Sequence, residues 1–168
     1  DVGSGKTLVA AISAVHVVES GHQVALMAPT ELLSEQHHRV FDGWFGPLGI
    51  NVVWLTGQVK GRARREALAS IEDGQADIVI GTHALFQDQV AFNSLGLVLV
   101  DEQHRFGVNQ RLSLTQRGLD DFTPHQLTMT ATPIPRTLSM VAYADLDCSV
   151  IDELPPGRKP ITTVLIDA

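Results

Sequence analysis

The chain opens with DVGSGKTLVAAISAV (residues 1–15), a glycine-containing turn followed at once by an apolar run. Gly5-Lys6-Thr7 match the end of the phosphate-binding pattern G-x-x-x-x-G-K-[ST], whose first glycine would fall one position before Asp1. In such a loop, backbone N–H groups hold phosphate oxygens, the lysine reaches the outer phosphates and the hydroxyl ligates Mg²⁺. The stretch predicts an α/β fold of the P-loop NTPase class, truncated at its N-terminus, with a buried helix over Lys6–Glu19. The alternative is a chance glycine turn before a helix.

Composition sets broad limits on the class of protein. The chain has 168 residues, 44% of them hydrophobic, which is typical of a globular domain. The single cysteine, Cys148, excludes a disulfide framework and is expected to be a small packed residue; we expect a cytoplasmic protein. The run Leu8–Val18 is too short for a membrane span, which needs about 20 apolar residues, so no membrane association is expected.

Short apolar runs alternate with longer amphipathic stretches along the chain. The predicted strands are Gln23–Met27, Val52–Thr56, Asp77–Gly81, Leu97–Val100, Gln126–Thr130 and Thr163–Ile166. The predicted helices are Lys6–Glu19, Leu32–Phe45, Arg62–Asp73, Val108–Arg117 and Pro135–Ala142. This alternation indicates βαβ units and a parallel sheet sandwiched by helices. Because functional residues collect at the carboxyl ends of strands in such sheets, the motifs there matter most.

Two adjacent carboxylates follow the apolar run that ends at Val100. By themselves Asp101 and Glu102 are explained equally well by a solvated acidic loop. After an upstream phosphate loop with Lys6, Asp101 is a candidate to hold Mg²⁺ and Glu102 to polarise the attacking water. Gln103 and His104 are candidates to sense the outer phosphate, although an ordinary loop histidine is the simpler explanation for the latter.

A third motif, TATPIPRT, spans residues 130–137. The hydroxyls of Thr130 and Thr132 are placed to hydrogen-bond toward the Asp101-Glu102 strand, which would couple the nucleotide state to motion. A purely structural explanation is a helix start, with Thr132 as N-cap and prolines fixing the turn.

These motifs resemble a known family in their identity and order. GSGKT, DEQH and TATP resemble the first motor lobe of superfamily 2 helicases, and more narrowly the RecG family of ATP-dependent helicases that remodel branched DNA. The resemblance covers essentially the whole chain. The other segments that carry it are residues 28–37, 81–87, 101–108, 130–138, 142–147 and 149–158.

The resemblance implies an enzyme that uses ATP and Mg²⁺ for fork reversal and Holliday junction branch migration. It implies a RecA-like ATP-binding lobe over residues 1–151, then a proline-rich linker and the start of a second motor lobe over 152–168. Expected partners are branched or duplex DNA, with a single-stranded-DNA-binding protein at forks as a further candidate, and a monomer is expected. The implied nucleotide and metal residues are Gly3, Ser4, Gly5, Lys6, Thr7, Asp101, Glu102, Gln103 and His104. The implied DNA contacts are Pro29, Thr30, Glu31, Thr56, Gly57, Gly81, Thr82 and His83, and the implied coupling residues are Thr130, Thr132 and Arg136.

Several alternatives stay open. The Mfd family shares two of the motifs, but it typically has a second glutamate where Gln103 stands. A non-catalytic nucleotide- or DNA-binding module and an unrelated P-loop ATPase are further hypotheses. The net charge of −7 weighs weakly against DNA, whereas a basic cluster at Lys60, Arg62, Arg64 and Arg65 offers a local patch. Phosphate contact and a solvated helix face explain that cluster equally well, with Ala63, Ala67, Leu68 and Ile71 on the buried side.

One expectation concerns activity. Superfamily 2 enzymes complete their ATP site with arginines from the second lobe, and an arginine finger is worth roughly 10³–10⁵ in rate. We therefore expect residues 1–168 alone to hydrolyse ATP negligibly. We also expect the loss of the strand before the phosphate loop, normally a central strand, to leave two unpaired sheet edges.

Overall fold

The computed structural model describes residues 4–87, 89–102, 123–131 and 147–151, and its chain divides into two compact units. The larger unit is residues 7–130, and the smaller one combines residues 1–6 with 131–168. The helices are α1 (Lys6–Glu19), α2 (Glu31–Phe45) and α3 (Gly61–Glu72), with 3-10 turns η1 (Gly46–Leu48) and η2 (His83–Phe86). The strands are β1 (Gln23–Met27), β2 (Val52–Leu55), β3 (Ile78–Gly81), β4 (Leu95–Asp101) and β5 (His125–Met129).

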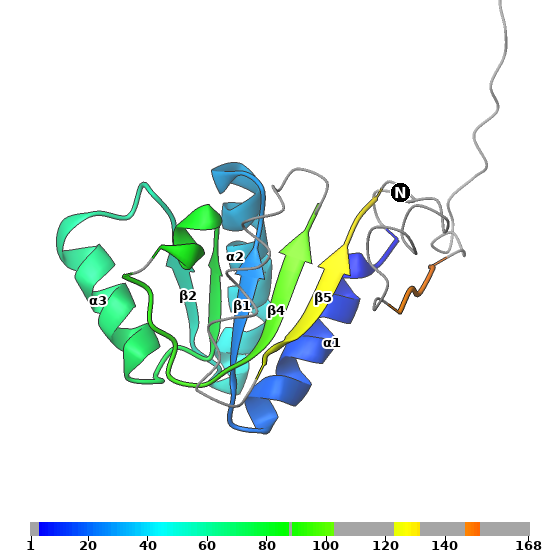
Figure 1. The fold of residues 1–168 in the computed structure, drawn as a ribbon, viewed down its shortest axis with the longest axis horizontal. Coiled ribbons are helices and arrows are strands. Elements are labelled where there is room, and N and C mark those ends of the chain that lie inside the picture. Colours follow the sequence, from blue (N-terminus) through cyan, green and yellow to red (C-terminus); the bar gives the residue numbers. More distant parts are fainter. Residues whose placement is uncertain (1–3, 88, 103–122, 132–146, 152–168) are drawn as a thin grey trace, which may run out of the picture. The chain divides into compact units, whose positions relative to one another are not determined.

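The five strands form one parallel sheet in the order β2-β3-β1-β4-β5 (Figure 1). Strand β1 lies at its centre, and all five of its residues are buried. The β4 run LGLVLVD is buried from Leu95 to Val100, as expected for a strand covered on both faces. The predicted parallel sheet with helices on both faces is confirmed. The loss of a central strand was expected to leave two unpaired strand edges inside the sheet. The described strands instead pair without interruption from β2 to β5.

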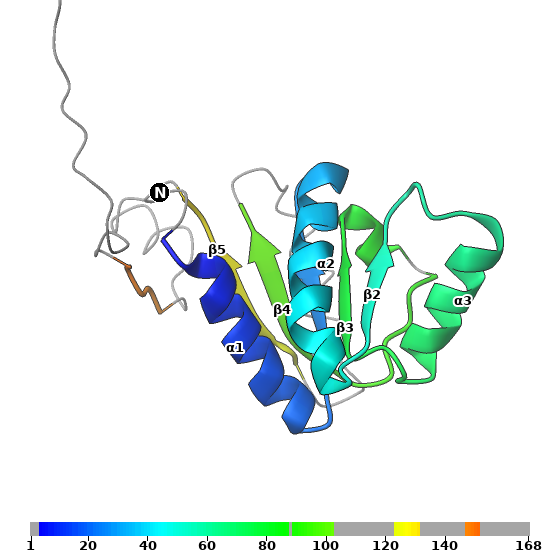
Figure 2. The ribbon, with the colours of Figure 1, turned by 180° about the vertical axis from the view of Figure 1, so that it is seen from behind.

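Alternate strand residues face two separate apolar clusters. Val24 and Leu26 of β1 pack in the cluster that includes the buried alanines of α1 and Phe41 and Phe45 of α2. Ala25 and Met27 point the other way, into the cluster that contains Ile71 of α3. Figure 2 shows α1 and α2 in front of the sheet when it is seen from behind. The period of two in the strands therefore builds a three-layer arrangement within the larger unit.

The boundaries agree closely with the sequence prediction. Helix α1 and strand β1 begin and end at the predicted residues, and the other described elements differ by one or two residues at an end. The predicted strand at 163–166 and the predicted helices at 108–117 and 135–142 lie outside the described residues.

Three packing predictions are wrong. Helix α1 is not buried all round. Ala10, Ala11 and Ala14 face the sheet, whereas three larger apolar residues are about half exposed because the described chain covers one side of the helix only; they are Leu8, Val9 and Ile12. In α3, Ala63 is exposed because the first turn lies beyond the residues that pack on the sheet, whereas Ile71 is fully buried. Cys148 is also exposed, since it lies in a described stretch without regular secondary structure.

None of the helices in the described part of the chain combines the length and the apolar character that crossing a bilayer would require.

Candidate functional site

The strand register brings the starts of four predicted motif segments, those after β1, β3, β4 and β5, to one edge of the sheet. At the carboxyl ends of the strands, Met27 pairs with both Gly81 and Val100, and Asp101 pairs with Met129. Two further backbone bonds continue this edge: Ala28 N donates to Gly81 O at 2.9 Å, and Glu102 N donates to Met129 O at 2.9 Å. The segments that follow β1, β3, β4 and β5 therefore begin side by side. This is the edge at which parallel α/β sheets bind ligands.

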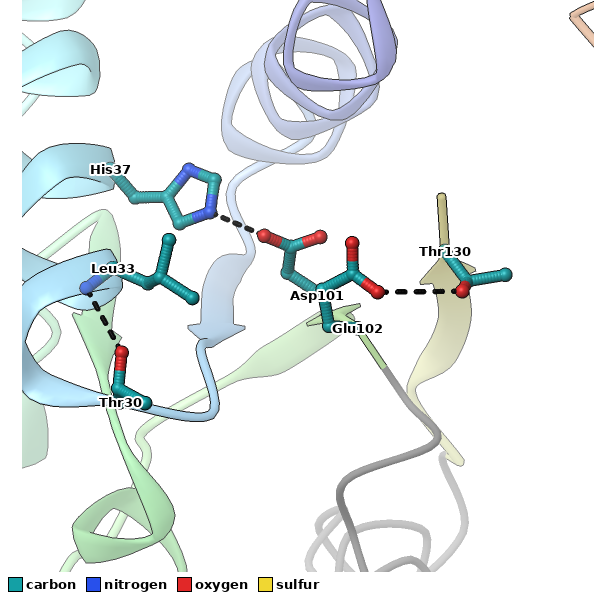
Figure 3. A network of polar contacts seen from close by, with 6 residues as sticks. All are labelled: Thr30, Leu33, His37, Asp101, Glu102 and Thr130. Atoms are coloured by element: carbon teal, nitrogen blue, oxygen red, sulfur yellow. Dashed lines mark hydrogen bonds and ion pairs between the residues drawn. The ribbon is translucent and has the colours of Figure 1, made fainter. Parts of the chain in front are cut away.

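Asp101 ends β4 and is held by a histidine from helix α2. The Nε2 atom of His37 lies 2.7 Å from Oδ2 of Asp101, and the two side chains are only 12% and 14% exposed (Figure 3). An ionised carboxylate accepts hydrogen bonds only, so Nε2 carries the proton and donates it. The sequence prediction included His37 only as part of a resembling segment. Its contact joins residues 64 positions apart, and no local pattern in the sequence reveals it.

Glu102 has a backbone conformation that non-glycine residues rarely adopt. Its φ is 52°, in the left-handed region. Its carboxylate oxygen Oε2 accepts a hydrogen bond from Thr130 Oγ1 at 3.4 Å (Figure 3). The predicted hydrogen bond from Thr130 toward this strand is therefore present, while its coupling role stays a prediction. A left-handed non-glycine residue costs about 1–3 kcal/mol, and such strain collects at functional sites.

The opening loop has the backbone expected before a phosphate-binding helix. Gly5 has a φ of 90°, which suits glycine, and α1 begins at the next residue, Lys6. The Lys6 ammonium donates to Ser4 Oγ at 3.2 Å. No acidic residue stands in the first turn of this 14-residue helix, so the partial positive charge at its N-terminus is not offset there by a carboxylate of that turn. These residues suit an anion such as phosphate.

The donor set fits Mg²⁺ as well. A threonine hydroxyl at Thr7 and a carboxylate at Asp101 are hard oxygen ligands of the kind that Mg²⁺ prefers. In the described residues, no three His, Cys, Asp or Glu side chains converge on a metal position. Mg²⁺ usually takes one or two carboxylates together with substrate phosphates and water, so a sparse donor set is the appropriate one.

The predicted DNA contacts divide into exposed and buried residues. Thr30 is exposed and caps α2, with its Oγ1 accepting from Leu33 N at 3.3 Å (Figure 3). The side chains of Thr56 and Thr82 are buried, and Thr56 Oγ1 accepts from Gln58 N at 3.3 Å. As whole residues they are 0% and 3% exposed, so neither their side chains nor their backbone groups reach the surface in this structure. Gly57 and His83 are exposed, while Pro29 and Glu31 are partly exposed.

Gly81 is required for close packing between neighbouring strands. A Cβ atom built on it would lie 2.0 Å from the carbonyl oxygen of Leu55 and 3.0 Å from Leu85 Cδ2. Its burial in β3 gives this glycine a structural role that the sequence analysis did not consider.

The basic cluster is partly committed to the chain itself. Arg64 donates to Thr56 O at 3.4 Å and to Gln87 Oε1 at 3.0 Å, so it fixes the turn after β2. Arg62 pairs with Glu66 at 2.6 Å, with both side chains largely in solvent. Lys60 and Arg65 are exposed at the first turns of α3. The remaining predicted site residues, Gly3, Gln103, His104, Thr132 and Arg136, lie outside the described residues.

Comparison with known proteins supports the helicase resemblance. The family model for DEAD/DEAH box helicases matches residues 1–141. ATP-dependent DNA helicase RecG from Escherichia coli (strain K12) is 65% identical over 167 residues, which is 99% of this chain and 24% of that protein. The RecG of Aquifex aeolicus is 50% identical over 98% of this chain and 21% of its own length. The chain thus spans about a quarter of the relatives it matches.

Solved structures also support the resemblance to helicases. A structure of RecG bound to a three-way DNA junction superposes with a TM-score of 0.80 and 45% identity, covering 95% of this chain and 21% of that one. A hypothetical ATP-dependent RNA helicase from Sulfolobus tokodaii, at 22% identity and a TM-score of 0.63, covers 88% of this chain and 45% of its own and shares the fold. The predicted RecG resemblance and RecA-like fold are confirmed, and the alternative of an unrelated P-loop ATPase is wrong.

Proposed function

The chain belongs to the DEAD/DEAH box helicase family, and from this premise we propose that it is the ATP-binding lobe of an ATP-dependent DNA helicase that remodels branched DNA. The reaction would be fork reversal and Holliday junction branch migration. In this proposal residues 1–151 form the first motor lobe, and residues 152–168 are the linker and the start of the second. The observation that carries it is the Asp101-Glu102 pair, held by His37 and Thr130 at the carboxyl edge, in a chain 65% identical to RecG.

Residues of the opening loop would bind the phosphates of ATP. Backbone N–H groups at Gly3, Ser4 and Gly5 and the N-terminus of α1 would receive phosphate oxygens. Lys6 would exchange its hydrogen bond to Ser4 for the outer phosphates. Gln103 and His104 are proposed to sense the outer phosphate from the segment after β4.

Asp101 and Glu102 would divide the chemical work. Thr7 and Asp101 would hold Mg²⁺, and the chemistry that this ion supplies when bound is neutralisation of charge on the phosphate oxygens. Glu102 would orient and polarise the attacking water, as a general base must, while Thr130 keeps its carboxylate in place. Thr132 and Arg136 are proposed to extend this link to the moving parts of the enzyme.

DNA would lie along the same edge and be held through its backbone. Thr30, Gly57 and His83 offer exposed groups, and the buried Thr56 and Thr82 hold the turns that carry Gly57 and His83. Pro29, Glu31 and Gly81 shape the same turns. Contacts of this type position a strand without reading its sequence, which suits a translocase. Branched DNA is the proposed substrate because the resemblance is to RecG, which has been solved with a three-way junction.

The remaining proposals rest on the resemblance alone. We propose that the complete enzyme acts as a monomer in the cytoplasm, and that a single-stranded-DNA-binding protein at forks is a further partner.

The test is steady-state Mg-ATP hydrolysis by the full-length protein that contains these residues. It is measured without DNA, with linear duplex and with a forked junction, all at one salt concentration because binding to DNA backbones is strongly salt-dependent. Preferential stimulation by the fork is expected. Equal stimulation by plain duplex would replace the branched-DNA function with that of a duplex translocase. DNA-stimulated turnover by residues 1–168 alone would contradict the need for a second lobe.

A further inference from the structure

The contact between His37 and Asp101 differs from the two Arg–Glu ion pairs found in the described residues. Arg39 pairs with Glu35, and Arg62 with Glu66, each one turn apart on one helix with largely solvated side chains. Surface pairs of that kind contribute little. His37 and Asp101 instead join α2 to β4, and both side chains are mostly buried. A hydrogen bond to a charged group is stronger where water is mostly excluded.

Helix α2 does not need this contact to stay on the sheet. Phe41 and Phe45 anchor it in the apolar cluster, and both are buried. Trp54 Nε1 of β2 donates to Ser34 Oγ at 3.0 Å, which fixes the N-terminal half of the helix. The role of His37 is therefore to be sought in what it does to Asp101.

We infer that His37 is a positioning residue for Asp101: its Nε2–H holds Oδ2 and thereby fixes which way the carboxylate presents its other oxygen to Mg²⁺ and the water around it. The inference rests on the proposed function, because it assumes that Asp101 serves a Mg-nucleotide. Oδ1 accepts no hydrogen bond from the part of the chain that the structure describes. The imidazole does not touch the substrate in this scheme, and the neutral ring with its proton on Nε2 is sufficient.

The expected effect of removing the His37 donor can be estimated from metal sites in other proteins. A metal-binding carboxylate is usually oriented by a hydrogen-bond partner, whose removal costs about 10–100-fold in metal affinity or activity. We therefore expect loss of the His37 donor to weaken Mg²⁺-dependent nucleotide binding by at least about tenfold. Binding in the absence of divalent metal should not change, because the proposed role of His37 acts through the metal ligand Asp101 and involves no residue of the opening loop.

The experiment uses the full-length protein with substitutions at three positions. H37A and H37F both remove the donor, and Phe keeps the bulk of the ring. H37Q returns an N–H group near the same place. H38A is the matched control, since His38 is the next residue on α2 and its ring lies 6.2 Å from the ring of Trp54 instead. D101N removes the charge that His37 holds.

The readouts are the Kd for mant-ATP, measured by fluorescence with Mg²⁺ and with EDTA, and the Mg²⁺ concentration that gives half-maximal ATP hydrolysis. For H37A and H37F we expect a Kd about tenfold or more higher with Mg²⁺ only, and a higher Mg²⁺ requirement. H37Q should recover part of the loss, and H38A should match the unmodified protein. Adding H37A to D101N should cost little beyond D101N alone, because the two residues act through one contact.

Two results would overturn the inference. One is a Mg²⁺ dependence of H37A and H37F equal to that of H38A. The other is an equal loss of mant-ATP affinity with Mg²⁺ and with EDTA, which would indicate general damage to the lobe. If circular dichroism shows that H37A does not fold, the comparison of H37F with H37Q tests the inference.

A K6A variant separates this failure from failure of the proposed function. If K6A binds mant-ATP as well as the unmodified protein, the nucleotide site itself is wrong. If K6A loses binding while the His37 variants keep it, only the inference about His37 fails.

Discussion

Gln23→Met tests how the amino-terminal edge of the sheet is held. The Gln23 side chain is 4% exposed at the start of β1. Its Nε2 donates to Ile71 O at 2.9 Å and to Ala76 O at 2.8 Å, and its Oε1 accepts from Ser94 N at 3.0 Å. One side chain thereby joins the end of α3 and the segments before β3 and β4 to the central strand.

The loss of stability on Gln23→Met depends on which backbone groups lose a hydrogen-bond partner. Ile71 O keeps a second donor, Gly74 N at 3.2 Å, so it is not left unpaired. Ala76 O, in a fully buried residue, loses its bond at about 1–3 kcal/mol, and the part-buried Ser94 N loses one at about 1 kcal/mol, the low end of that range. Methionine has nearly the same shape, which limits any cavity. We expect the free energy of unfolding to fall by about 2–4 kcal/mol, a large part of the stability of a typical domain.

The assay is urea unfolding of residues 1–168, followed by the fluorescence of Trp44 and Trp54, the two tryptophans of the chain. With a slope of about 2 kcal/mol per molar urea, the midpoint should fall by about 1–2 M. Gln75→Met is the control, because Gln75 is exposed and lies on the same edge. A change below about 1 kcal/mol for Gln23→Met, or one equal to that of the control, would refute the reasoning.

Three further predictions concern the carboxyl edge of the sheet. Gly81→Ala should destabilise the chain by at least about 2 kcal/mol, because the added Cβ meets Leu55 O; Gly43→Ala, where a Cβ meets nothing within 4 Å, should be neutral or stabilising in the same urea assay. Glu102→Gln in the full-length protein should lower ATP turnover by about 10²-fold or more while mant-ATP binding is kept, and an equal loss of both would contradict its role as base. Thr130→Val should lower turnover about three- to tenfold through loss of one hydrogen bond to Glu102, whereas Thr128→Val on the same strand should have no such effect.

Much of the fold could be predicted from local sequence. The continuous apolar run at Leu97–Val100 predicts a buried strand. The glycine-containing turn before Lys6 predicts the start of a helix. The strand-then-carboxylate pattern at Asp101-Glu102 predicted that these two candidate residues lie at the carboxyl edge, where the structure has them, because all strands of a parallel sheet end together.

Packing between distant segments could not be predicted. The period of α1 does not reveal which of its apolar sides faces the sheet, so Leu8 and Ile12 were expected to be buried and are exposed. Thr56 and Thr82 read as surface hydroxyls, but their side chains are turned inward and, for Thr56, used by the turn itself. The His37 contact depends on how α2 crosses the sheet, which only the assembled fold determines.

The amino and carboxyl edges of this sheet are expected to have different roles. At the amino edge, buried Gln23 satisfies backbone groups within the chain, so that edge is expected to govern stability. At the carboxyl edge, Glu102 has a strained backbone and Asp101 offers one carboxylate oxygen beyond its bond to His37, which are features of a site built to receive a ligand. Gln23→Met should therefore change unfolding without changing the Mg²⁺ requirement of the full-length protein, whereas His37→Phe should raise the Mg²⁺ requirement beyond any effect on unfolding from the lost buried hydrogen bond. If both substitutions moved both quantities in proportion, the edges would not be separable and the site would depend on the stability of the whole lobe.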